Sequence, residues 1–302
     1  MSAPPVAPTG AGKTSQSGAR PFGSRIRTQF KPARVLVGTL VLVLLWEIVA
    51  RVLTRGMANP QYVMPDLVYV ARHGLPGISD YYRGMFGGAL TSEGAPHSVR
   101  LGLAALLEHG LISSGRFVVG FVAGTAAGLA AGLMMSAVRP VRLATFGVAN
   151  MLRMLPLLAL APLFTLWFGP NTLASVVFIA FVVALITIIG TLNAVQNLDP
   201  STAEYARTLG VTRLATYRRV ILPGILPELC ATTLLCVPMA WSVLLASELY
   251  GIQTGIGWMM GQALAFTLVD RITVIAAVFI VLTFVSLRLV QFVNGRVTSW
   301  AE

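Results

Sequence analysis

Charged residues are scarce in this chain. Only 11% of its 302 residues are Asp, Glu, Lys or Arg, whereas 56% are apolar and the mean hydropathy is +0.77. Soluble domains carry about 25% charged residues, so this balance excludes an ordinary soluble domain and indicates an integral membrane protein. A membrane span must be a helix or part of a closed barrel. Because the apolar runs are long and do not alternate, we expect an all-α membrane protein.

Cysteine and histidine are also rare. The two cysteines, Cys230 and Cys236, lie six positions apart in an apolar stretch and lack metal-binding spacing, so we expect small core residues. His73, His97 and His109 fall in one expected loop and are interpreted as surface residues. The sequence contains no serine elbow and no zinc-binding spacing. We therefore expect no catalytic residue, no metal and no cofactor in this chain.

Acidic residues are few, and basic residues outnumber them by 22 to 11. The resulting net charge of the chain is +11. Membrane proteins commonly carry an excess of Lys and Arg in their cytoplasmic loops, so this charge does not lead us to expect nucleic-acid binding. Residues 1–34 are basic, rich in Pro, Gly and Ser, and are expected to form a disordered cytoplasmic leader. Within it, Gly10-Ala-Gly-Lys-Thr14 resembles the end of a phosphate-binding loop. Position 7 is Ala instead of the first glycine, so the motif is incomplete.

Six apolar stretches are long enough to be membrane spans. Six spans place both termini on one side, and most basic clusters then fall on that side, which the positive-inside rule makes the cytoplasm. The residues between the first two spans, 56–112, read as a mixed loop with amphipathic pieces. The six spans are expected over residues 35–53, 116–137, 152–168, 172–194, 225–249 and 272–292.

Glycine recurs at every fourth position of the second expected span. Gly120, Gly124, Gly128 and Gly132 form a stripe on one helix face, and small residues let helix backbones approach closely in lipid. Tight packing within the chain is the favoured interpretation, and a seam between two copies is the alternative.

Prolines and acidic residues inside the spans are candidates for a transport pathway. Pro156 and Pro162 interrupt the third span, where freed carbonyls are tolerated if they face protein or a water-filled cavity. Glu248 follows Trp241 in the fifth span, and an intramembrane acid is a functional candidate by default. Glu248 either faces the pathway or holds the glycine-rich loop that follows it. The candidate pathway-lining residues are Pro156, Pro162, Trp241 and Glu248.

A polar, basic segment separates the fourth and fifth expected spans. Asp199 suits the N-cap of a helix that begins at Pro200, and Gly210 suits the position just after its end. A second short helix is expected after Thr212, and Pro223 marks the entry into the fifth span. The segment is therefore predicted to form two short helices joined at a glycine on the cytoplasmic face.

At this segment the sequence resembles the permease subunits of binding-protein-dependent bacterial ABC importers. Their signature loop reads Glu-Ala-Ala, three residues, Gly, nine residues, Ile, one residue, Leu-Pro. Tyr205 replaces the first Ala and Val220 replaces Ile. The residues that the resemblance assigns to the ATPase-coupling loop are Glu204, Tyr205, Ala206, Gly210, Leu222 and Pro223.

The resemblance extends from about residue 61 to the C-terminal end, and its motifs look like the nitrate/sulfonate/taurine branch of these permeases. It implies a six-helix type I importer permease over residues 35–302, with a core at 97–296. It also implies a bacterial inner-membrane location with both termini cytoplasmic. The motifs of the branch are Leu155-Pro-Leu-Leu-Ala-Leu-Ala-Pro-Leu163, Leu166-Trp-Phe-Gly169, Ala240-Trp241, Ser247-Glu248 and Gly255-Ile-Gly257.

The same resemblance implies the partners. They are a cytosolic ABC ATPase dimer that binds ATP and Mg, an extracytoplasmic substrate-binding protein and a second permease copy, expected as a homodimer. Membrane lipid is a further partner for the arginines of the segment. The implied cargo is a small anion such as an alkanesulfonate, taurine or nitrate, although related permeases also carry neutral or cationic heterocycles such as pyrimidine vitamin precursors.

The alternative function is an ion- or proton-coupled secondary carrier that works without an ATPase. Glu47 and Glu248 would form its relay. Such carriers are built from internal repeats with paired broken helices. The flanks of the prolines in the third and fifth spans do not resemble each other, so the sequence does not favour this alternative.

Overall fold

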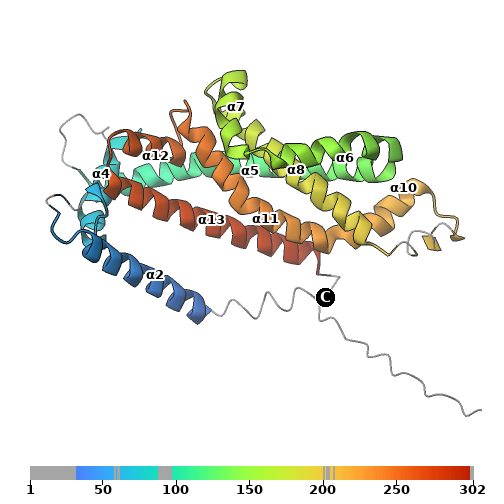
Figure 1. The fold of residues 1–302 in the computed structure, drawn as a ribbon, viewed down its shortest axis with the longest axis horizontal. Coiled ribbons are helices and arrows are strands. Elements are labelled where there is room, and N and C mark those ends of the chain that lie inside the picture. Colours follow the sequence, from blue (N-terminus) through green and yellow to red (C-terminus); the bar gives the residue numbers. More distant parts are fainter. Residues whose placement is uncertain are drawn as a thin grey trace, which may run out of the picture. The chain divides into compact units, whose positions relative to one another are not determined.

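The computed structural model is helical and has no strand in the part of the chain that it describes (Figure 1). The chain divides into two compact units, residues 1–45 with residue 302, and residues 46–301. Helix α2 (Pro32–Leu53) contains the boundary between them and confirms a helix at the first expected span. The described residues are 32–57, 59, 62–87, 97–199, 201, 205–206 and 208–299.

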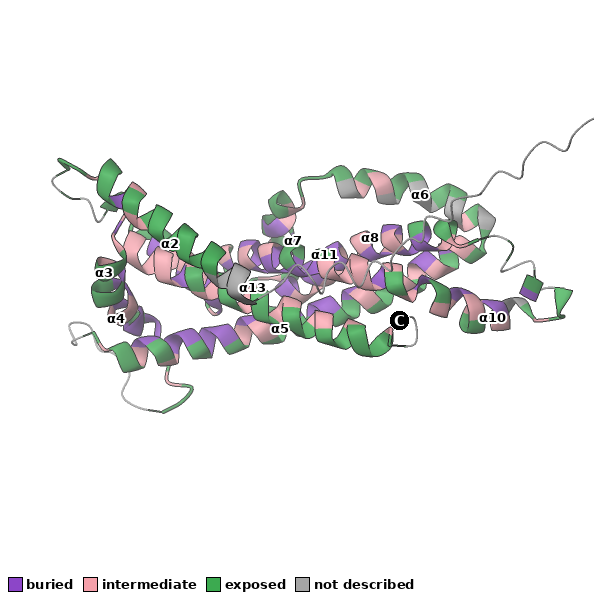
Figure 2. Cartoon of the chain, turned by 90° about the horizontal axis from the view of Figure 1, so that it is seen from below, coloured by how far each residue is buried: buried purple, intermediate pink, exposed green. Residues whose placement is uncertain are grey.

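Long apolar helices dominate the second unit. In the described part of the chain, four helices have the length and composition to cross a membrane, so the count of six spans stays a prediction. Their packed faces carry the buried residues in Figure 2, with Phe178, Ile179 and Trp241 at the centre. The four are α5 (Val99–Ala137), α8 (Thr172–Asn197), α11 (Leu222–Leu249, continuous with residues from Leu214) and α13 (Val269–Val297).

The glycine stripe of α5 packs against α8 within the chain. A Cβ on Gly124 would lie 2.6 Å from the carbonyl oxygen of Ala180. A Cβ on Gly128 would lie 2.7 Å from that of Ala184. Only glycine therefore lets the two backbones meet at this distance. The favoured interpretation, tight packing within the chain, is confirmed.

The second expected span begins much earlier than predicted. Helix α5 starts at Val99, so residues 99–112, predicted as part of a mixed loop with amphipathic pieces, are helical. The rest of the segment 56–112 that the structure describes also holds short helices instead of an irregular loop. These are α3 (Leu67–Tyr69), the π-helix η2 (Val70–Gly74), α4 (Leu75–Gly77) and the 3₁₀ helix η3 (Ile78–Tyr81).

The third expected span is not one helix. Helix α6 (Arg139–Met154) ends before Pro156, the 3₁₀ helix η4 spans Leu157–Leu160, and α7 spans Ala161–Phe168. Pro156 lies at the break between α6 and η4. Pro162 lies in the first turn of α7. The N–H groups of a first helical turn have no partner within the helix, so a proline there removes no helical hydrogen bond. The prediction that Pro162 interrupts a helix is therefore wrong.

The three remaining expected spans, 172–194, 225–249 and 272–292, coincide with the long helices α8, α11 and α13. The side-chain oxygen of Asn171 caps α8 by accepting the N–H of Ala174 at 3.1 Å. Helix α12 (Ile256–Ala265) follows the glycine-rich loop and leads to α13.

Candidate functional site

The segment around Gly210 ends a helical turn as predicted. Gly210 has φ +74°, and the N–H of Val211 donates to the carbonyl of Ala206 at 3.2 Å. This six-to-one bond is the closing bond of a Schellman motif, in which glycine is the preferred left-handed residue. Tyr205 and Ala206 are helical, whereas Glu204 lies outside the described residues.

Asp199 makes the capping contact expected at the start of this segment. Its carboxylate accepts the backbone N–H of Ser201 at 2.9 Å, and that hydrogen bond lowers the pKa of Asp199. Pro200, the expected first helical residue, lies outside the described residues.

The predicted second short helix is not separate from the fifth span. The hydroxyl of Thr212 accepts the N–H of Ala215 at 3.4 Å and starts α10 (Arg213–Thr216). The π-helix η5 (Tyr217–Ile221) follows and continues directly into α11. Leu222 and Pro223 are half-buried at the point where η5 continues into α11. The prediction of two short helices is therefore corrected to one helical turn and the start of a long helix.

Apolar side chains are exposed on both sides of Gly210. The exposed fractions of Tyr205, Leu209 and Leu214 are 69%, 67% and 80%, whereas Ala206 is buried. We name these three residues the coupling face, because they lie within or beside the loop to which the resemblance assigns ATPase coupling.

A buried ion pair lies at the other end of α11. Nη1 of Arg116, on α5, is 2.7 Å from a carboxylate oxygen of Glu248, and the two side chains are 4% and 1% exposed. The carboxylate also accepts the hydroxyl of Ser113 at 2.9 Å and the backbone N–H of Gly257 at 2.8 Å. A charge at this depth is tolerated because it is paired and hydrogen-bonded.

Arg116 extends the network to the glycine-rich loop and to α8. Its guanidinium donates to the carbonyl of Thr254 at 2.8 Å and to the Thr254 hydroxyl at 2.7 Å. It also reaches the hydroxyl of Thr172 at 3.2 Å. The N–H groups of one arginine therefore connect α5, α8, α11 and the loop after α11.

His109 holds the same loop from α5. Its Nδ1 accepts the N–H of Gly255 at 2.9 Å, and its Nε2 lies 3.0 Å from the carbonyl of Tyr81. A carbonyl only accepts, so Nε2 carries the proton and the imidazole is neutral. The expectation that His109 is a surface residue is wrong, because it is fully buried. We name His109, Ser113, Arg116 and Glu248 the loop-anchoring cluster.

Glycine is required where the loop meets this cluster. Gly255 has φ +107°, and a Cβ there would overlap the carboxylate of Glu248. Two roles were open for Glu248, facing the pathway or holding the glycine-rich loop. Its contacts with Gly255 and Gly257 are those of a residue that holds the loop. The sequence places Arg116 at the start of an expected span and does not predict its pairing with Glu248. The available signal was a basic and an acidic residue within apolar helices, which usually pair with each other.

The candidate pathway residues do not lie together. Pro156 and Pro162 are exposed on the η4–α7 segment, whereas Trp241 is fully buried and stacks on Phe117 with ring centroids 4.9 Å apart. Glu248 belongs to the loop-anchoring cluster. A pathway-lining role for these four residues stays a prediction.

Solved structures share this arrangement of apolar helices. The methionine ABC transporter MetNI in inward-facing conformations matches with a TM-score of 0.53 at 17% identity, covering 65% of this chain and 96% of that chain. A bacterial ABC transporter involved in the import of the acidic polysaccharide alginate matches with a TM-score of 0.54 at 15% identity. The match covers 91% of this chain and 99% of that chain. The fold is therefore that of an ABC importer permease.

The family follows from the sequence itself. Residues 124–299 match the family described as binding-protein-dependent transport system inner membrane component, which is more than half of the chain. The chain belongs to this family and is a permease subunit of an ABC importer, as the resemblance implied.

The relatives found by sequence comparison are also named transport permease proteins. The aliphatic sulfonates transport permease protein SsuC of Bacillus subtilis is 29% identical over 65% of this chain and 71% of that protein. SsuC of Escherichia coli is 34% identical over 56% of this chain and 64% of that protein. The taurine transport system permease protein TauC of Escherichia coli is 27% identical over 65% of this chain and 72% of that protein.

Proposed function

We propose that this permease imports a small organic anion, such as an alkanesulfonate or taurine, with nitrate as a further candidate, powered by a separate ATPase that binds the coupling face. The observation that carries the proposal is the Gly210 turn, which presents exposed Tyr205 and Leu209 just before α10. The ATPase would bind the nucleotide and Mg, and this chain would need no cofactor. An extracytoplasmic binding protein would deliver the cargo.

The geometry supports a mechanical coupling. A helical turn held in a cleft of the ATPase moves as a rigid body when the ATPase closes. The segment after Gly210 continues without interruption into α11, so its displacement reaches the transmembrane region directly. In this proposal two permease copies form the pathway as a homodimer, both termini face the cytoplasm, and the arginines of the segment contact anionic lipid.

The cargo proposal rests on the relatives, whose names specify sulfonates and taurine. Arg116 does not offer a positive charge to an anion in transit, since Glu248 neutralises it. The alternative of a secondary carrier loses support from the partners of its relay acids. Glu47 pairs with Arg51 at 2.7 Å, and Glu248 pairs with Arg116.

The backbone at Gly210 provides the test of coupling. We expect Gly210→Val to reduce ATP-driven taurine uptake by about tenfold or more, because an L-residue in the left-handed region costs roughly 1–2 kcal/mol and valine is β-branched. A Cβ at position 210 would have no atom within 4 Å, so the change acts on the backbone and not by a clash. The measurement is uptake into proteoliposomes that contain the permease, its ATPase and its binding protein.

Gly210→Asn is the matched control, since asparagine tolerates positive φ. It should keep most of the uptake, and both variants should insert into the membrane at wild-type levels. Equal uptake by the wild type and Gly210→Val would remove the proposed role of the turn. Uptake in liposomes that lack the ATPase would instead support the secondary carrier.

A further inference from the structure

Helices α5 and α8 run parallel to each other, and this constrains the chain that connects them. Nε of Arg116 lies 3.3 Å from the hydroxyl of Thr172, at the start of α8. Further along both helices, a Cβ on Gly132 would lie 2.6 Å from the Cβ of Thr191. Residues 138–171 must therefore return from the end of α5 to the level of Arg116. That level lies 21 positions back along α5, or about 32 Å, which is close to the hydrocarbon thickness of a bilayer.

Helix α6 makes the first part of this return. It begins at Arg139, directly after α5, contacts both α5 and α8, and runs back along them in Figure 1 and Figure 2. Its 16 residues cover about 24 Å before the break at Pro156. Because α5 and α8 have the length and composition of membrane spans, α6 lies at the depth of the bilayer beside them.

Three arginines follow one face of α6. At about 100° per residue, the helical positions of Arg139, Arg142 and Arg153 fall within an arc of about 60°. The half-buried Val141 lies on one side of this arc, and the exposed Leu143 lies on the other. We name the three arginines the arginine face. It therefore lies between the packed side of α6 and its exposed apolar side.

Acidic residues are absent from the sequence around this face. No Asp or Glu occurs from His109 to Leu198, a stretch that contains α6, α7, α8 and most of α5. On α5 itself, Glu108 lies about 44 Å from the end that adjoins α6. At that end of the bundle, Glu228 of α11 accepts the side-chain amide of Asn197 at 2.9 Å. The sequences of α5 and α8 therefore bring no carboxylate to the arginine face.

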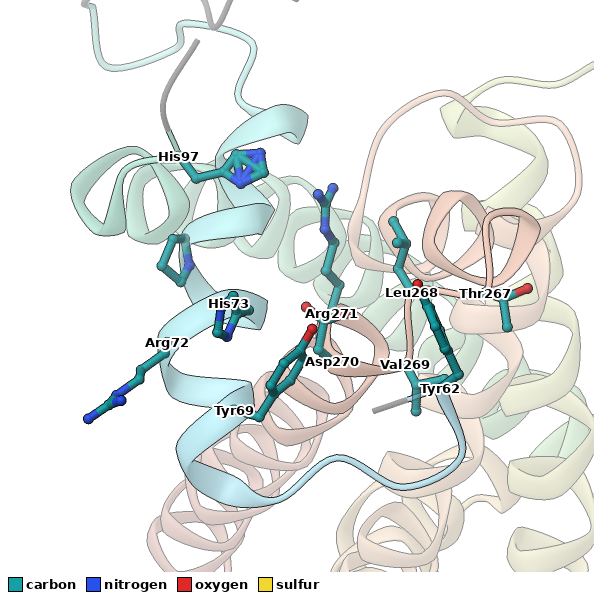
Figure 3. Close-up of a pocket in the computed structure, with 11 residues that line it drawn as sticks. Tyr62, Tyr69, Arg72, His73, His97, Thr267, Leu268, Val269, Asp270 and Arg271 are labelled. Atoms are coloured by element: carbon teal, nitrogen blue, oxygen red, sulfur yellow. The ribbon is translucent and has the colours of Figure 1, made fainter. Parts of the chain in front are cut away.

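The pocket beside the first turn of α13 provides a contrast (Figure 3). Nη1 of Arg271 lies 2.8 Å from Asp80, and the same carboxylate lies 3.5 Å from Nε2 of His97. Asp270 is a further lining residue of this pocket. Its basic groups are therefore already balanced by carboxylates, and it offers no net positive charge to an anion.

We propose that the arginine face of α6 lines the translocation pathway and binds the anionic group of the cargo. This inference rests on the proposed anionic cargo and names the residues that would recognise it. Charged residues at membrane depth pair with one another or face a water-filled cavity. Since the adjoining helices supply no opposite charge, the water-filled cavity is the environment that suits three arginines.

The chemistry of arginine suits this role. Its guanidinium stays charged at membrane depth and donates two parallel hydrogen bonds to the oxygens of an oxyanion, as a sulfonate offers. Arg153 lies about 21 Å along the helix from Arg139, just before the break at Pro156. The three positions therefore form a row of positive charges that leads from the end of α5 into the membrane.

Sulfonate uptake tests the arginine face. Variants are reconstituted with the ATPase and the binding protein, and uptake of radiolabelled ethanesulfonate is divided by ATP hydrolysed, which corrects for poorly assembled protein. We expect Arg153→Gln to lower this ratio by about tenfold or more, the loss of a charge-assisted hydrogen bond. Arg153→Lys keeps the charge and should recover part of the uptake. Arg100→Gln, at an exposed position in the first turn of α5, should stay within about twofold of the wild type.

Cysteine labelling tests the water-filled path without transport. In a chain whose Cys230 and Cys236 are replaced by alanine, Asn150→Cys lies beside the arginine face, and the control Val148→Cys lies on the exposed apolar side of α6. We expect negatively charged sulfonatoethyl methanethiosulfonate to label Asn150→Cys about tenfold faster, because the reactive thiolate forms in contact with water. Adding Arg153→Gln should slow this reagent but not its positively charged trimethylammonium analogue.

The outcomes separate this inference from the proposed function. Normal ethanesulfonate uptake by the wild type with an equal ratio for Arg153→Gln would overturn the role of the arginine face and leave the anionic cargo in place. If the wild type imports neither ethanesulfonate, taurine nor nitrate, the proposed cargo and this inference both fail. Equal labelling of Asn150→Cys and Val148→Cys would contradict a water-filled path along this face.

Discussion

Arg116→Met is expected to destabilise the permease by about 3–5 kcal/mol, the cost of leaving one member of a buried ion pair without its partner. Glu248 would remain 1% exposed with only Ser113 and Gly257 as donors. The loop at Thr254 would lose two hydrogen bonds as well. We expect a large fall in the melting temperature of the purified protein.

The two free cysteines provide the readout for this variant. Cys236 is buried and Cys230 is partly buried, so a thiol-reactive dye labels them as the helices separate. The matched control is Arg100→Met, on the exposed first turn of the same helix, which should melt close to the wild type. The double variant Arg116→Met/Glu248→Met should recover most of the stability, since replacing a whole buried pair by apolar residues is often neutral. Equal melting of Arg116→Met and the wild type would show that the pair is not structural.

Gly128→Leu is expected to separate α5 from α8 and to lower the yield of folded protein severely. A Cβ there would lie 2.7 Å from the carbonyl oxygen of Ala184 and from the Cβ of Thr187. Inserting methylenes into a packed core costs about 1–3 kcal/mol when side chains can move, and the backbone of α8 cannot move locally. We therefore expect a larger effect than that range.

Gly115→Leu is the matched control for this packing. It lies on the same helix, is exposed, and a Cβ there would have no atom within 4 Å. The same glycine-to-leucine change should therefore leave the folded yield unchanged, as measured by size-exclusion chromatography in detergent. Equal yields for the two variants would mean that the close approach of α5 and α8 is not needed for folding.

Features that depend on residues close together in the sequence were predictable from the sequence alone. The apolar run of α8, the stripe of glycines and the turn at Gly210 each follow from residues within a few positions of one another. The fold class followed from composition alone, since nearly charge-free runs of this length must be helical in lipid.

Features that depend on distant partners were not predictable in this way. Residues 99–112 contain Glu108 and His109, and this polarity is typical of a loop between membrane spans. His109 is hydrogen-bonded to Gly255, which lies 146 positions away, and Arg116 pairs with Glu248, which lies 132 positions away. A single sequence shows neither contact. The break at Pro156 was visible, but the sequence alone does not say whether a proline kinks a helix or ends it.

The helix that runs from Leu214 to Leu249 has a mechanical consequence. At 1.5 Å per residue its 36 residues form a lever about 54 Å long, with the coupling face at one end and Glu248 at the other. Pro227 and Pro238 are the points where such a lever flexes. Under the proposed coupling, a displacement at Leu214 would reach the Gly255 loop through one continuous helix that can bend at these two prolines.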